Sequence, residues 1–189
     1  VQAGTAPLGA RRTGSQGPVD TRNGQYVSGN FFRTLGVNPW IGRLMTDDDD
    51  QPGAPPVAVM SYRIWSDKYG SDPSVVGASY QINGHLFTVI GVAPPGFYGA
   101  KLAGWGMRDI WLPTNTEALL GGEAQRLKRP NTNWLDIIGR VRPGVDPRTL
   151  EARLRVELQN WLGSHESDMN PREKQTWRQQ TLNLIPGGA

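Results

Sequence analysis

A β-hairpin signal at residues 78–92 constrains the fold of this chain more than any other local feature. Two β-prone runs, 78–82 and 85–92, flank the dipeptide Asn83-Gly84. A two-residue connection between antiparallel strands favours a type I′ turn, in which both central residues have positive φ, and Asn-Gly suits both positions. The sequence therefore predicts a hairpin that turns at Asn83 and Gly84. His85 follows the turn directly, which favours a position on the strand surface over a catalytic role.

A second informative stretch, YVSGNFFRTLGVNPWIGRLMTDDDD, covers residues 26–50. Its apolar spacing predicts a short helix that starts after Ser28, a good N-cap, and ends at Gly36, which suits the left-handed residue after a helix. Gly42 and Arg43 then mark a turn before the acidic run. We predict that Gly36, Gly42 and Arg43 form a structural junction between two lobes.

Four consecutive aspartates at residues 47–50 suggest a metal site at first sight. A calcium loop spaces its oxygen ligands at alternate positions, with a central Gly and a distant Glu, and this run lacks that pattern. Adjacent carboxylates also repel one another and generally face water. We therefore expect a solvated loop without a metal ion.

Composition and motifs exclude several classes of function. The 20 basic and 17 acidic residues give a net charge of only +3, and aromatic residues do not alternate with Lys or Arg, so nucleic-acid binding is disfavoured. With no cysteine and two histidines, the chain offers no thiolate site and no recognisable Ser-His-acid triad. A Walker phosphate-binding loop is absent too. We predict no catalytic, cofactor-binding or metal-binding residues.

The expected elements indicate an α+β fold in two lobes. Asp146 and Pro147 start an amphipathic helix, between predicted strands at 134–141 and 181–185. With a strand and helix near the start, these pieces fit a discontinuous ferredoxin-like lobe formed by residues 21–41 and 134–189. Residues 42–133 would form an inserted, mostly-β lobe around the hairpin, and residues 1–20 an extended lead-in.

Tryptophans supply the remaining candidate for binding. Trp105 lies in a Gly-rich loop, where an exposed aromatic ring could contact a partner, although packing of the ring on its own domain is the favoured interpretation. A secreted carbohydrate-binding or glycoside-hydrolysing module stays open as an alternative function. It requires an exposed Trp105 or Trp111 beside two carboxylates about 5 to 10 Å apart.

Several segments in succession resemble the MacB-type periplasmic core domain of ABC-transporter permeases (MacB/FtsX-like). The resemblance runs through the stretch at 26–49, PVAVMSYRIWSDKYGSDPSVVGASYQINGHLFTVIGVAPPGF at 56–97, DIWLP at 109–113 and IIGRVRPGVDPRTLEARL at 137–154. It covers most of the chain beyond residue 25. The order of the matches is more specific than any single one.

The resemblance implies a non-catalytic domain on the outer face of the cytoplasmic membrane, with a porter-like lobe and an inserted second lobe. Its implied partners are the permease transmembrane helices on either side, a cytoplasmic ABC ATPase, and a periplasmic adaptor or other outer partner. It also implies a dimer in the full transporter. We expect the printed sequence to be part of such a longer polypeptide, since no run in it is long and apolar enough for a transmembrane helix.

Overall fold

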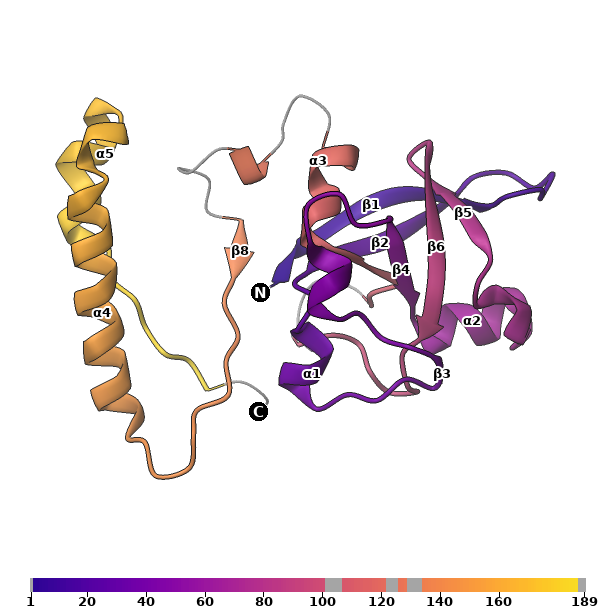
Figure 1. Cartoon of the computed structure of the whole chain (residues 1–189), viewed down its shortest axis with the longest axis horizontal. Helices are drawn as coiled ribbons and strands as arrows, with labels where there is room; N and C mark the ends of the chain where they lie inside the picture. Colours follow the sequence, from indigo (N-terminus) through magenta and orange to yellow (C-terminus); the bar gives the residue numbers. More distant parts are fainter. Residues whose placement is uncertain (1, 101–106, 122–125, 129–133, 187–189) are drawn as a thin grey trace. The chain divides into compact units, whose positions relative to one another are not determined.

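The computed structural model describes residues 2–100, 107–121, 126–128 and 134–186 (Figure 1). The chain divides into two compact units, Val1–Gly139 and Arg140–Ala189. Each unit has its own secondary structure and is described separately.

Six strands of the first unit close into a barrel. Neighbours around the ring pair in the order β1, β2, β7, β4, β6 and β5, and β5 pairs back with β1. The β2–β7 and β4–β6 pairs are parallel and the other four are antiparallel. Closure leaves no free edge along most of the ring. The strands are β1 (Gln2–Arg12), β2 (Asp20–Val27), β4 (Val57–Met60), β5 (Ser79–Ile82), β6 (His85–Val92) and β7 (Ile110–Pro113).

Two short strands extend this ring. β3 (Ile41–Gly42) pairs antiparallel with the end of β6, and β8 (Leu135–Asp136) pairs antiparallel with the start of β1. Of the predicted strand at 134–141, only these two residues of β8 are in a strand. Ile137, directly after β8, is 83% exposed. Its apolar side chain therefore has no buried position that would favour a longer strand.

The barrel core consists of alternate residues from all six strands. Each strand contributes side chains to one buried cluster, and α2 (Tyr62–Tyr69) adds Ile64 and Trp65 to it. A second cluster contains Val59 and Trp111, whose neighbours in sequence belong to the first cluster, and it packs against α1 (Phe31–Leu35). Because successive strand residues face opposite sides, this alternation buries both faces of β4 and β7.

Short helical segments connect the strands of the first unit. Ser61 caps α2 by accepting a hydrogen bond from the Ile64 backbone N–H, and Gly70 ends the helix in the left-handed conformation. The cap of α1 is Asn30 rather than the predicted Ser28, whose carbonyl instead accepts from Phe31 N–H. The other segments are η1 (Asp47–Asp50), η2 (Pro73–Val75), η3 (Thr114–Thr116), α3 (Glu117–Leu120) and η5 (Arg126–Lys128).

The β5–β6 hairpin has the geometry that Asn-Gly favours. Ile82 pairs with His85, and the two residues between them have φ of 45° at Asn83 and 85° at Gly84. The turn also binds β1, since Asn83 exchanges hydrogen bonds of 2.8 Å with the backbone of Gly9.

Two features of unit 1 differ from the predicted layout. Residues 1–20, expected as a lead-in outside both lobes, contain β1, which pairs with β2, β5 and β8. The boundary expected near residues 41 and 42 does not separate two sheets, because β2 pairs with β7 from the segment predicted as an insertion. Small residues hide the strand character of β1 in the sequence, and its pairing depends on backbone bonds to distant segments.

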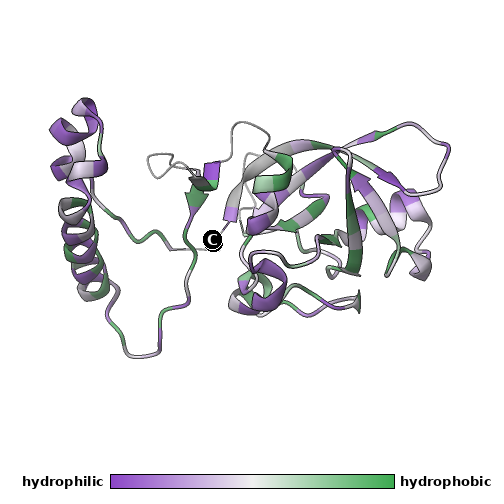
Figure 2. Cartoon of the chain, turned by 45° about the horizontal axis from the view of Figure 1, so that its top comes forward, coloured by the Kyte–Doolittle hydropathy of each residue, from purple (hydrophilic) through white to green (hydrophobic). Residues whose placement is uncertain are grey.

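The second unit is helical. It contains α4 (Pro147–Ser164), η6 (Glu166–Asp168), α5 (Pro171–Thr176) and η7 (Trp177–Gln179). Asp146 caps α4 through the backbone N–H groups of Arg148 and Thr149, as predicted. Polar and apolar residues alternate along α4 (Figure 2). Trp161, predicted on its buried face, is 50% exposed. The described part of the chain contains no helix with the length and apolarity of a membrane span.

Residues 180–184 lie along α4 without forming the predicted closing strand. The Gln159 and Arg155 side chains donate to the carbonyls of Gln180 and Leu182, at 2.6 and 2.8 Å, and Glu151 accepts from Leu184 N–H at 2.8 Å. The bonded residues are four apart on α4 and two apart in the extended segment. Four helical residues rise about 6 Å and two extended residues span about 6.6 Å, so successive bonding groups lie opposite one another. Side chains of α4 thus replace a neighbouring strand.

Candidate functional site

The junction around Gly42 depends on a backbone contact that only glycine permits. Gly42 has φ of 69°, and a Cβ there would lie 2.4 Å from the Ile90 carbonyl oxygen. Opposite it on β6, a Cβ on Gly91 would lie 2.2 Å from the Arg43 carbonyl oxygen. Hydrogen bonds from Trp40 N–H to Val92 and from Arg43 N–H to Ile90, at 2.8 and 2.9 Å, flank the contact. Two glycines therefore allow β3 to seat against β6.

Arg43, the next residue, forms an ion pair with Asp49. Its two terminal nitrogens donate to the two carboxylate oxygens of Asp49, at 2.6 and 2.7 Å. Thr46 N–H also donates to Asp49 Oδ2, at 2.8 Å. Asp49 is 9% exposed. The Arg43 hydrogen bonds lower the pKa of Asp49 despite the opposing effect of burial, and the same bonds raise the pKa of Arg43.

Asp50 ties two further segments to the junction. It accepts from Asn115 N–H, just after β7, at 2.8 Å and from Gly29 N–H, just before α1, at 3.3 Å. Burial raises its pKa, and the backbone donors partly counter this shift. Gly29 has no room for a side chain, because a Cβ would lie 2.2 Å from the Thr46 carbonyl oxygen.

The acidic run is therefore only half solvated, which corrects the expectation of a solvated loop. Asp47 and Asp48 face water, and Asp47 pairs with exposed Arg33 at 2.8 Å. Asp49 and Asp50 turn inward. The Arg43 guanidinium donates hydrogen bonds to Asp49, and the backbone N–H groups of Gly29 and Asn115 donate to Asp50. Among the described residues, no group of three or more His, Cys, Asp or Glu is arranged to hold a metal ion.

An aromatic cluster packs between α1 and the residues that follow Arg43, since Leu44 and Met45 belong to the same buried cluster. Phe31, Phe32, Phe97 and Trp111 have ring centroids 5.2 to 6.3 Å apart. Gly36 ends α1 in the left-handed conformation, with φ of 70°. Trp111 is fully buried, so it cannot be the exposed sugar platform that the carbohydrate alternative needs.

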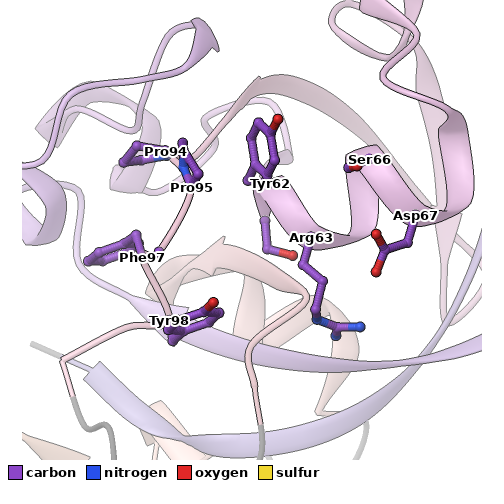
Figure 3. Close-up of a pocket in the computed structure, with 10 residues that line it drawn as sticks. Tyr62, Arg63, Ser66, Asp67, Pro94, Pro95, Phe97 and Tyr98 are labelled. Carbon is purple, nitrogen blue, oxygen red and sulfur yellow. The ribbon is translucent and has the colours of Figure 1, made fainter.

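A cavity of about 240 Å³ opens between α2 and the loop after β6. Figure 3 shows that α2 supplies Tyr62, Arg63 and Asp67, and that the loop supplies Phe97 and Tyr98, among the residues drawn. Arg63 forms an ion pair with Asp109, which is buried at the start of the DIWLP segment and also accepts from Asn23 N–H at 2.9 Å. The cavity thus presents aromatic rings beside a cation that is already neutralised.

Comparison with known families decides the identity of the fold. The family model of the MacB-like periplasmic core domain matches residues 2–156. The chain belongs to this family. A comparison with curated protein sequences finds no match.

Two solved structures share the fold of this MacB-like domain. The periplasmic region of MacB from Actinobacillus actinomycetemcomitans aligns with a TM-score of 0.59 at 17% identity, over 96% of this chain and 76% of that one. The extracellular domain of the noncanonic ABC-type transporter YknZ from Gram-positive bacteria aligns with a TM-score of 0.50 at 18% identity, over 66% of this chain. The match spans 58% of the YknZ domain. The mixed α/β class is thereby confirmed.

The predicted site residues of this MacB-like domain that the structure describes lie in three places. Gly42 and Arg43 lie together at the junction. Asn83 and Gly84 lie at the other end of β6, and Gly36 ends the helix that packs on the aromatic cluster. Trp105, the predicted partner contact, lies outside the described residues.

Trp40 is an exposed aromatic residue that sequence reasoning missed. It is 51% exposed, and its ring packs edge-on against Tyr62 of the cavity, with centroids 5.4 Å apart. Its backbone N–H is fixed by Val92. The signal available in the sequence was a large aromatic residue directly after Asn38-Pro39, outside any apolar periodic run.

Proposed function

We propose that this MacB-like domain is a non-catalytic extracytoplasmic part of an ABC-transporter permease. The family match over residues 2–156 carries the proposal. Transmembrane helices of the permease would hold the domain at the outer face of the cytoplasmic membrane. A cytoplasmic ABC ATPase would hydrolyse ATP, and the domain would couple that hydrolysis to export or to engagement of an outer partner, such as a periplasmic adaptor.

The junction supports a mechanical role within this function. Residues 43–50 bind Gly29, Asn115 and β6 at the same time, because Asp50 accepts from the backbone N–H groups of the first two and Arg43 N–H donates to the Ile90 carbonyl of β6. The bidentate ion pair between Arg43 and Asp49 lies within the segment and holds its two ends together. Gly29, Asn115 and β6 belong to segments far apart in sequence. A displacement of one segment would therefore move the others with it. Arg-carboxylate pairs of this kind add geometric specificity as well as energy.

We also propose that the second unit contributes the helical layer of a ferredoxin-like porter lobe, as predicted for residues 134–189. The regular spacing of bonds between α4 and residues 180–184 supports this assignment, because it holds a chain extended beside a helix. The full transporter would be a dimer.

Labelled transporter tests the coupling. Because the sequence has no cysteine, Ser79→Cys on β5 would provide one spin label per domain in the full-length permease, assembled with its ATPase in nanodiscs and with any native cysteines replaced. We expect the label-to-label distance in the dimer to change on ATP binding. Arg43→Ala should reduce that change while ATP hydrolysis continues.

The matched control is Arg33→Ala, which removes the exposed pair with Asp47 and should leave the distance change intact. An unaltered distance in the wild-type transporter across the ATP cycle would refute the coupling role. Equal effects of the two Arg substitutions would refute the role of the junction.

A further inference from the structure

A second cavity, of about 180 Å³, lies where β1 ends, beside the β1–β2 connection and α2. Charged groups dominate its lining. The lining includes Arg11, Arg12, Asp20, Arg22, Lys68 and Tyr69. Four cationic side chains thus surround one carboxylate, in a chain whose total net charge is only +3.

Two of the four cations are already paired. Arg22 donates to Asp20 at 2.5 Å, and Arg12 lies 3.5 Å from Asp72. Arg12 also donates to the Ser74 carbonyl and hydroxyl oxygens. These contacts hold both guanidinium groups in place at the cavity.

The other two cations have no described acidic partner. Arg11 donates to the neutral Gln81 side chain at 3.1 Å. Lys68, on the exposed face of α2, makes no ion pair with any residue that the structure describes. Two positive charges therefore face the same cavity without neutralisation.

Arg22 gives this cavity a rigid charged wall. Its side chain is 8% exposed although it lines the cavity. A guanidinium carries five N–H donors, and Asp20 is its acceptor among the described contacts. No Arg22 nitrogen is among the described buried atoms that lack a hydrogen-bond partner, so Arg22 contributes a fixed positive charge to the cavity and not an unsatisfied donor.

We propose that this cavity binds a phosphoryl group, either a free phosphate ester or the headgroup of an anionic phospholipid. Planar guanidinium groups match phosphate oxygens in pairs, and Lys adds a point charge. The cavity volume of about 180 Å³ is several times the share of one water molecule in the liquid, about 30 Å³. A phosphate and part of its ester therefore fit inside. The proposal does not depend on a transport function.

Binding to the intact domain tests this proposal at low ionic strength, where exposed charges are least screened. Isothermal titration with glycerol phosphate probes the free ester. Co-sedimentation with phosphatidylglycerol vesicles, against pure phosphatidylcholine vesicles, probes the lipid. We expect the double variant Arg11→Gln/Lys68→Gln to weaken binding at least tenfold in whichever arm is positive.

The matched control is Arg153→Gln/Lys174→Gln, which removes the same charge from exposed positions of the second unit and should bind like the wild type. Binding of glycerol phosphate identifies a free ester, and binding to vesicles alone identifies a lipid headgroup. The proposal is overturned if neither probe binds the wild type, or if the two double variants bind equally well.

Discussion

Gly91 offers the sharpest test of the junction. Its φ lies outside the left-handed region, so alanine suits its backbone conformation, and the only obstacle is space. The new Cβ would lie 2.2 Å from the Arg43 carbonyl oxygen and 2.8 Å from its backbone nitrogen. Both are backbone atoms and cannot swing aside as a flexible side chain could.

The cost follows from the two ways of relieving this clash. If β3 stays in place, the strain of overpacking is about 1 to 3 kcal/mol. If β3 moves away, the bonds from Trp40 N–H and Arg43 N–H to β6 are lost, at about 1 kcal/mol each. We therefore expect Gly91→Ala to lower the free energy of unfolding by about 2 kcal/mol. For a chain of this size, that lowers Tm by about 4 to 8 °C.

Thermal unfolding followed by circular dichroism measures the effect. Gly139→Ala is the control, because a Cβ there would have no atom within 4 Å and its φ is also ordinary. Any Gly-to-Ala change lowers the entropy of the unfolded chain, which stabilises the fold by about 0.4 to 1 kcal/mol, and the Gly139→Ala control carries the same contribution. If the two variants unfold at the same temperature, the close approach of β3 and β6 is not what makes glycine necessary at position 91.

Three other predictions concern separate contacts. Asp49→Asn removes the ion pair with Arg43 and should cost about 2 kcal/mol in urea unfolding at pH 7, whereas Asp47→Asn, at the exposed pair, should change stability by less than about 0.5 kcal/mol. Gly84→Ala places a Cβ at φ of 85° in the hairpin turn and should lower stability by about 1 kcal/mol or more, and an unchanged urea midpoint would contradict this. Glu151→Ala removes the acceptor of Leu184 N–H, so hydrogen exchange of that amide should accelerate while exchange in the β-barrel stays constant.

Local signals in the sequence located the features that depend on one or two residues. The Asn83-Gly84 turn needs only its own dipeptide, and the start of α4 needs only Asp146 and Pro147. In both cases the conformation depends mainly on neighbours in sequence. Gly42 and Arg43, predicted as a junction between two lobes, instead join β3 to β6 within one sheet, about 50 positions further along the chain.

Features that depend on distant partners were missed. The parallel pairing of β2 with β7 joins residues more than 80 positions apart, and nothing in either strand specifies it. Asp49 and Asp50 look like solvated carboxylates until Arg43 and Asn115 are known to face them. The basic cavity likewise combines the end of β1 with α2, so its charge balance could not be read from the nearly neutral composition.

Asp49, which is buried, and Asp50, which is half-buried, should respond to acid in opposite ways. Asp49 has a lowered pKa, so its contribution to stability is complete above the unfolded value of about 3.9 and is lost as pH falls through its folded pKa. Asp50 has a raised pKa, so its contribution is present below the unfolded value and is lost as pH rises through its folded pKa. Because the pKa of Asp50 is raised and that of Asp49 is lowered, a fall in pH should protonate Asp50 first and release the Arg43 contact of Asp49 only at a lower pH. An acid titration in which the stability gap between wild type and Asp49→Asn stays unchanged below pH 4 would contradict the loss of the Arg43 contact in acid.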